Sequence, residues 1–292
     1  MSRTVSRVKP LSSLSPRWLR RVVAALTAGV LVPILPLPGT GEVSAIAWSD
    51  EELTATAPGY VTSIHASARR PRPANQFCSG MLVAPSWVLT AAHCYDDAEG
   101  VATSVRINGS IVRRVVAVYV PGRYAGLPST EAYLSGADIA LLRLARPVEG
   151  VAPVLLPSGT DPSKSGTARV YGFGLDENGR DPQRLGARTV ELESGEWAAR
   201  LYPFLPARQI SAWGKRTWEF DTGNGEIVSN SRADGAVCEG DSGGPLVVGS
   251  PAGDVAIGVV SYGIDCAEAG PSVYTKVFAH LKWVKRTIRA AE

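Results

Sequence analysis

Short runs rich in Val, Ile, Leu and Thr recur along this chain of 292 residues, and turn-forming residues separate them. Runs of this length and punctuation are typical of β-strands in an all-β fold. A Pro- and Gly-rich crossing near residues 150–165 divides them into two series, which predicts two β units. The predicted strands are Tyr60–Ala66, Phe77–Val83, Trp87–Thr90, Ser104–Ile107, Ile111–Tyr119 and Ile139–Leu144, then Ala168–Phe173, Thr189–Glu193, Glu226–Ser229, Leu246–Val248, Val255–Tyr262 and Val273–Val277.

Near the C-terminus, apolar residues recur at helical spacing. Val277, Leu281, Val284 and Ile288 form one apolar stripe, and four Lys and Arg residues lie between them. The pattern predicts an amphipathic helix packed on a barrel, with His280 in a structural role. A basic membrane-binding helix is the alternative, but a packed and solvated helix accounts for the same pattern.

The first 45 residues are typical of a signal peptide. Three arginines between positions 17 and 21 precede the apolar run Val22–Leu37, and small residues then lead to Ala45. We therefore predict that residues 1–45 direct export and that the protein is secreted, while the paired arginines leave the export route open. A membrane anchor is the alternative, but the run is shorter than the about 20 residues of a spanning helix and contains two prolines.

The four cysteines form two sequence-local pairs, Cys78 with Cys94 and Cys238 with Cys266. In an exported chain this pattern predicts two disulfides. Metal ligation is the alternative, but neither pair has Cys-x-x-Cys spacing and the chain has only three histidines. We expect no metal and no cofactor.

The charge balance bears on the partners. With 30 basic and 27 acidic residues the net charge is +3, and no long run of like charge occurs. Neither nucleic acid nor a stable membrane association is expected from so balanced a surface.

The run Cys238–Pro245 reads Cys-Glu-Gly-Asp-Ser-Gly-Gly-Pro and is the most informative in the chain. A nucleophilic serine needs a tight turn that presents its hydroxyl, with backbone N–H groups facing the oxygen that becomes negative. Flanking glycines permit this turn. We predict that Ser242 is the nucleophile and that the N–H groups of Gly240 and Ser242 form an oxyanion hole.

A serine nucleophile needs a base, and histidine has a suitable pKa. His93 ends a predicted strand among small residues beside Cys94, whereas His65 and His280 lie in a predicted strand and helix. The imidazole in turn needs a buried carboxylate. Asp138 opens an apolar strand, which would place it at the edge of a core.

Three segments, in this order, resemble the signature motifs of the chymotrypsin/trypsin family of serine proteases: Thr90–Cys94, Asp138–Leu142 and Gly240–Pro245. Phe77–Gly80, Gly172–Gly174, Ser261–Gly263 and Val273–Val277 extend the resemblance, which covers about residues 58–290. It implies two orthogonal Greek-key β-barrels with a C-terminal α-helix, residues 46–155 and 156–292, and a cleft that holds His93, Asp138 and Ser242. It also implies a serine endopeptidase that forms an acyl-enzyme with protein or peptide substrates, and we expect a monomer.

The resemblance also implies which residues line the specificity pocket. Ala236 stands where trypsin-like members have an aspartate, and Val237 follows it. Gly263 leaves one wall open, Ser272 replaces a common glycine, and the segment Ser261-Tyr262-Gly263 would bind the substrate backbone. We therefore predict a preference for apolar side chains of moderate size, unless Asp234 or Asp265 reaches the pocket.

Family members pair the aspartate before the nucleophile, here Asp241, with a new N-terminus of the Ile-Val-Gly-Gly type. A buried carboxylate without a cation costs several kcal/mol. This chain lacks that sequence, and we predict that cleavage after Ala45 creates the terminus at Ile46, although Trp48 and Ser49 replace the glycines. The basic segment Arg69–Arg72 is the alternative cleavage region.

Two other functions compete with the protease. A catalytically silent binding protein on the same fold would normally have lost a triad residue, and none is missing here. An esterase with a Gly-x-Ser-x-Gly elbow could use the late His280, but the alternation of strands and helices of α/β-hydrolases is absent from the sequence.

Overall fold

The computed structural model describes residues 46, 49–50, 55–66, 76–95, 103–125, 136–162, 166–176, 178–180, 184–192, 226–230, 237–263 and 271–291. All of them belong to one compact unit, residues 42–292. The predicted signal peptide, the basic segment Arg69–Arg72, Ala236 and Cys266 lie outside the described residues.

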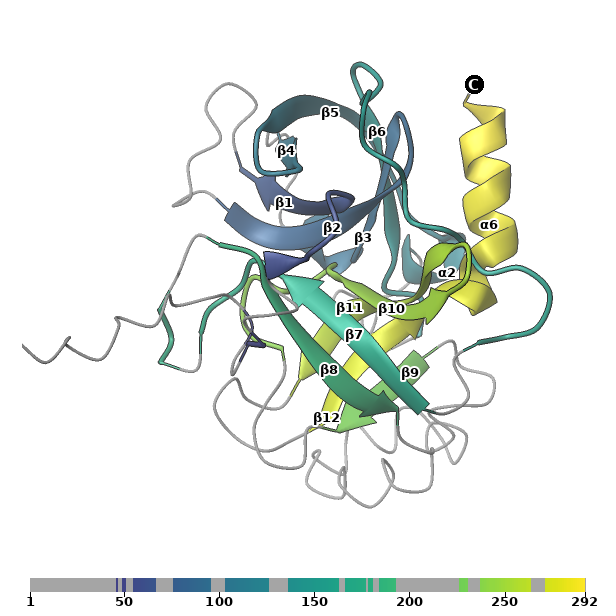
Figure 1. Ribbon diagram of the computed structural model, residues 1–292. Helices are drawn as coiled ribbons and strands as arrows, with labels where there is room; N and C mark the ends of the chain where they lie inside the picture. The colour runs from purple at the N-terminus through teal and green to yellow at the C-terminus, as the bar shows by residue number, and fades with distance from the viewer. Residues whose placement is uncertain are drawn as a thin grey trace, which may run out of the picture. The chain divides into compact units, whose positions relative to one another are not determined.

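Six strands of the first half close into a barrel (Figure 1). Their order is β1-β2-β3-β6-β5-β4, and β4 pairs with β1 to complete the ring. Since β3 pairs with β6 instead of β4, the chain makes a Greek-key crossing. The strands are β1 Val61–His65, β2 Gln76–Ala84, β3 Trp87–Thr90, β4 Ser104–Ile107, β5 Ile111–Tyr119 and β6 Ala140–Leu144.

A second barrel repeats this topology in the second half of the chain. Read from β7, its order is β7-β8-β9-β12-β11-β10, closed by the pairing of β10 with β7. The predicted fold class, two β-barrels with a C-terminal helix, is therefore confirmed. The strands are β7 Gly166–Gly172, β8 Gly186–Leu192, β9 Glu226–Asn230, β10 Pro245–Ser250, β11 Gly253–Gly263 and β12 Pro271–Lys276.

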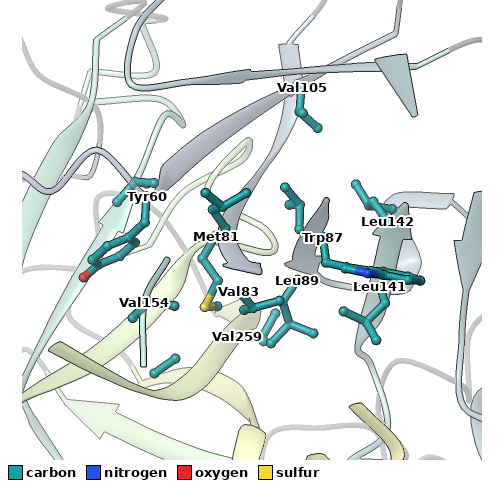
Figure 2. Packing of buried hydrophobic residues seen from close by; sticks show 14 of the residues in the cluster. Tyr60, Met81, Val83, Trp87, Leu89, Val105, Leu141, Leu142, Val154 and Val259 are labelled. Carbon is teal, nitrogen blue, oxygen red and sulfur yellow. The ribbon is translucent and has the colours of Figure 1, made fainter. Parts of the chain in front are cut away.

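Figure 2 shows the apolar core around β2, β3 and β6. Met81, Leu89 and Leu141 are fully buried there, and Val259 of β11 belongs to the same cluster. Burial of apolar side chains stabilises the fold by roughly 25 cal/mol per Å² removed from water. This cluster includes residues of both barrels. Apolar packing therefore joins the two barrels.

The chain crosses from the first barrel to the second through a segment bonded to both. The N–H of Val154 donates to the carbonyl of Leu82 in β2, and the N–H of Leu155 donates to the carbonyl of Asp254 in β11. The predicted domain boundary between residues 155 and 156 stays a prediction. Within this segment, Val154 is hydrogen-bonded to the first barrel and the next residue, Leu155, is hydrogen-bonded to the second.

The C-terminal helix α6 spans Val277–Ala290. Val277 and Val284 are buried on its packed side, while Lys282 and Lys285 are exposed. The predicted amphipathic helix therefore forms, although Val277 begins the helix and does not extend β12. In the part of the chain that the structure describes, no helix has the length and apolar character to span a membrane.

Each predicted strand lies within a few residues of an observed one. Among the elements that the structure describes, the 3-10 turn η2 at His93–Tyr95 and the single turn α2 at Gly122–Ala125 were not predicted. Both are too short for hydrophobic periodicity to reveal.

Candidate active site

A disulfide fixes the backbone next to His93. Cys78 of β2 and Cys94 of η2 are bonded, with their Cα atoms 6.3 Å apart. The bond closes a loop of 16 residues, which is worth about 3 kcal/mol on the chain-entropy model. His93 therefore sits on a turn tied to the adjacent strand, and the first of the two predicted disulfides is present.

His93 is held at two points by Asp138. Its Nδ1 lies 2.7 Å from Oδ2 of Asp138, and its backbone N–H donates to Oδ1 at 2.9 Å. Pairing of β3 with β6 sets this contact, because Thr90 lies opposite Ala140. A carboxylate accepts at Nδ1, so that nitrogen carries the proton and Nε2 presents a lone pair.

Asp138 has no exposed surface, and a second residue donates to it from the other barrel. Ser261 Oγ of β11 donates to Oδ2 at 2.5 Å. The sequence placed Ser261 in the segment predicted to bind substrate backbone, but it held no signal for this side-chain contact. The residues are 123 positions apart.

The turn around Ser242 depends on glycine. Gly240 and Gly243 have φ angles of +92° and +84°, a region that L side chains rarely adopt. A Cβ atom on Gly243 would lie 2.0 Å from Oγ1 of Thr90. The turn is closed by the N–H of Asp241 to the carbonyl of Cys238 at 3.0 Å. Glycine is therefore required for this turn to approach β3.

The fold brings the Ser242 turn against the strand and the disulfide that hold His93. The N–H of Ser79 in β2 donates to the carbonyl of Ser242 at 2.7 Å. Sγ of Cys94 lies 3.9 Å from the same oxygen. Ser242 therefore adjoins the residue that follows His93, although 148 positions separate it from Cys94.

The residue before Ser242 is a fully buried carboxylate. Asp241 accepts the N–H of Gly174 at 2.7 Å and the N–H of Cys238 at 2.8 Å. No Lys or Arg side chain among the described residues pairs with it. Burial raises the pKa of Asp241 to about 7, and the two N–H groups only partly offset this effect.

Ile46 is buried in the apolar cluster of the second barrel, together with Val237 and Tyr274. Its carbonyl accepts the hydroxyl of Ser49 at 2.8 Å, and the N–H of Asp50 donates to Ala187 of β8 at 2.8 Å. The segment around Ile46 is thus anchored on the second barrel, which also holds Asp241.

Comparison with known proteins agrees with this geometry. Residues 54–284 match the trypsin family. The chain belongs to the trypsin family of serine proteases. It is 33% identical over 221 residues to snake venom serine protease Haly-2 of Gloydius brevicauda, covering 72% of this chain and 77% of that protein. It is 31% identical over 232 residues to chicken trypsin II-P29, covering 73% and 80% of the two chains.

A third relative is larger. Rat transmembrane protease serine 9 is 31% identical over 230 residues, which make up 74% of this chain but only 20% of that protein. This chain therefore corresponds to about a fifth of the larger relative's length and to most of the venom and chicken proteins.

Of the residues predicted to form the specificity pocket of this trypsin-family chain, several are described. Val237 is buried in the cluster with Ile46, and Ser272 is buried opposite Gly263 in the pairing of β11 with β12. Tyr262 is half-buried and Gly263 is exposed. Since Cys266 lies outside the described residues, the second disulfide stays a prediction, and Cys238 is buried.

The other two histidines each contact a polar group. His65 is buried, with Nε2 2.9 Å from the hydroxyl of Ser63. His280 of α6 lies 2.8 Å from the carbonyl of Gly136, and burial lowers the pKa of His280. Gly136 lies two residues before Asp138, so α6 supports the loop that leads to it.

One group of potential metal ligands occurs among the described residues: Cys78, His93 and Cys94. Its two sulfur atoms form the disulfide and offer no thiolate. This group does not fit a metal ion.

Proposed function

We propose that this trypsin-family chain is a secreted endopeptidase in which Ser242, His93 and Asp138 act as a catalytic triad. The proposal rests on one observation: Asp138 holds both Nδ1 and the backbone N–H of His93, at 2.7 Å and 2.9 Å. This geometry orients the ring and leaves Nε2 as the proton acceptor. It also favours an enzyme over a silent binding protein, because a chain without catalysis needs no such orientation.

In the proposed reaction, Oγ of Ser242 attacks the peptide carbonyl carbon and its proton passes to Nε2 of His93. The carbonyl oxygen becomes an oxyanion that accepts the N–H groups of Gly240 and Ser242. His93 then protonates the leaving amine as the C–N bond breaks, which leaves an acyl-enzyme on Ser242. Water, activated by His93, adds to the acyl carbon and releases the acid and Ser242.

The experiment is labelling of the secreted chain with a peptidyl phosphonate, which reacts with activated serine. We expect one label, located on Ser242 by mass spectrometry and absent from S242A and H93A. Ser110→Ala removes an exposed serine and is the matched control, which should label as the wild type does. A properly folded and processed chain that takes no label would favour the catalytically silent binding protein.

Activation is proposed to require cleavage after Ala45, so that the ammonium group of Ile46 meets Asp241. Ile46 has φ +67° while Ala45 is attached, a conformation that costs a β-branched residue about 1–3 kcal/mol. Cleavage removes the preceding carbonyl and with it this strain. The new ammonium would supply the cation that the buried carboxylate lacks among the described residues.

N-terminal sequencing of the secreted protein tests this activation. We expect the active form to begin at Ile46. A form that begins within or after Arg69–Arg72 and is fully active would favour the alternative cleavage region.

The predicted specificity is for apolar side chains of moderate size. It is supported by the burial of Val237 among apolar residues and by the uncharged Ser272 opposite Gly263. A peptide library that varies only the residue before the scissile bond measures this preference. Strong selection of Arg or Lys would contradict it.

A further inference from the structure

The carbonyl oxygen of Gly240 is held by two side chains of the other barrel. Oγ of Ser79 donates to it at 2.9 Å, and Nε2 of Gln76 donates to it at 3.1 Å. The same nitrogen of Gln76 lies 3.3 Å from the carbonyl of Cys78, which identifies it as the amide donor. A carbonyl has two lone pairs, so these two donors satisfy it fully.

Ser79 joins three segments at one point. Its hydroxyl donates to Gly240 and accepts the N–H of Phe173 at 3.0 Å. Its backbone N–H donates to the carbonyl of Ser242 at 2.7 Å, and its carbonyl accepts the hydroxyl of Thr90 at 2.7 Å. With no exposed surface, Ser79 contacts both residues of the proposed oxyanion hole.

The Gly240 turn needs such support because few steric clashes limit rotation about the backbone bonds of a glycine. At φ +92° it has no Cβ to restrict alternative backbone angles. Without Ser79 and Gln76 its carbonyl would lose both donors, and an unsatisfied carbonyl is stabilised by turning toward water. Rotation about the Gly240 backbone bonds would then change how the N–H groups of Gly240 and Ser242 are oriented relative to each other.

We propose that Ser79 and Gln76 are positioning residues for the oxyanion hole: they hold the carbonyl of Gly240 so that the N–H groups of Gly240 and Ser242 stay aimed at one point. This inference rests on the proposed function, because it concerns acyl transfer at Ser242. Neither residue touches the substrate; both act through Gly240.

The role predicts an effect on the transition state and not on ground-state binding. Ser79→Ala and Gln76→Met each remove one donor at similar side-chain size, and each should lower kcat about tenfold with KM changed less than about twofold. Affinity for a peptide boronic acid, whose tetrahedral adduct carries the oxyanion, should fall by the same factor. The double variant should lose more than the two single losses combined, since either donor alone partly holds the carbonyl.

Ser63→Ala is the matched control. Ser63 lies directly opposite Ser79 in the pairing of β1 with β2, is buried, and its hydroxyl contacts His65. The Ser63→Ala variant therefore removes one buried hydroxyl from the same sheet and leaves the contacts of Gly240 unchanged. Thermal unfolding of each variant separates lost stability from lost positioning, and Gln76, which is only half-buried, provides a variant that folds if Ser79→Ala does not.

The closing experiment measures the infrared carbonyl frequency of the acyl-enzyme that the processed, secreted protein forms. Weaker hydrogen bonding to the acyl oxygen raises this frequency, so we expect an upward shift in Ser79→Ala and Gln76→Met and none in Ser63→Ala. An unchanged frequency and boronate affinity in the two variants overturns the inference alone. A wild-type protein that forms no acyl-enzyme overturns the proposed function, and this inference with it.

Discussion

Ser261 Oγ donates a 2.5 Å hydrogen bond to Oδ2 of Asp138, the same oxygen that lies 2.7 Å from Nδ1 of His93. Ser261 lies on β11 in the second barrel, and Asp138 precedes β6 in the first. The carboxylate that orients His93 is therefore held from both barrels. A shift of one barrel against the other would therefore change the hydrogen bonds to Oδ2 of Asp138.

Replacing Ser261 by Ala should lower kcat/KM by about 10- to 150-fold, because a hydrogen bond to a charged group is worth about 1.5–3 kcal/mol. Steady-state kinetics on a peptide substrate measures the effect. Ser250→Ala, which removes a hydroxyl from the second barrel that bonds only to the local turn, is the control. Equal kinetics for the two variants would show that Asp138 does not need this donor.

The chain that still carries residues before Ile46 should lose stability as the pH rises. Asp241 has a folded pKa of about 7 against an ordinary value of 3.8, so folding favours its protonated form. Stabilisation is therefore complete below about pH 4 and is lost as the pH rises through 7, by up to about 4 kcal/mol. Urea unfolding of the S242A precursor between pH 4 and 8 measures this change.

Asp241→Asn is the control for this dependence, since an amide does not titrate. The pH dependence should flatten in that variant. It should also weaken in the processed chain, where the proposed ammonium of Ile46 would stabilise the ionised carboxylate. Parallel curves for the precursor and its Asn variant would disprove the assignment to Asp241.

Gly243→Ala should destabilise the fold by about 3 kcal/mol or more and abolish phosphonate labelling. The new Cβ would lie 2.0 Å from Oγ1 of Thr90 and 2.3 Å from the carbonyl of Ser79, at a φ angle of +84°. Gly109→Ala is the control, because its φ is +67° but a Cβ atom built there would meet no neighbouring atom within 4 Å. Its cost, about 1 kcal/mol, measures strain without a clash. Similar losses for the two variants would contradict close packing at Gly243.

Tyr60→Phe should lower the free energy of unfolding by about 1–3 kcal/mol. The Tyr60 hydroxyl, just before β1, donates to Oδ2 of Asp254 in β11 at 2.8 Å, while Arg169 of β7 pairs with Oδ1. Burial raises the pKa of Tyr60 well above its ordinary value, so this donor persists into alkaline solution. A double-mutant cycle with Asp254→Asn, followed by urea unfolding, should show coupling. Purely additive losses would mean that the contact does not link the barrels.

The sequence predicted the strands well because each has its own local signal. The run Ile111–Tyr119 is observed as predicted, since β-branched residues between turn formers favour an extended backbone. Val277 was assigned both to the end of a strand and to the start of the helix, because an apolar residue at a strand–helix junction fits both patterns, and the structure places it in the helix. The turn at His93–Tyr95 carries too few residues for any period.

The motifs around Ser242, His93 and Asp138 could be found from sequence because glycine turns, small residues and an apolar strand are local requirements. Their spatial relation could not, and neither could the contacts of Ser261, Ser79 and Gln76. These contacts join residues 123, 161 and 164 positions apart. The closure of the two barrels determines which loops come into contact.

Local patterns in the sequence were enough to predict twelve strands and to predict that a serine, a histidine and an aspartate stand at turns suited to acyl transfer. Local steric and hydrogen-bonding preferences suffice for that. The burial of Asp241 without a cation among the described residues, and the hydrogen bond from Ser79 to Gly240, come from the packing of the two barrels. Burial and long-range hydrogen bonds arise when distant segments exclude water together, and no local pattern encodes that event.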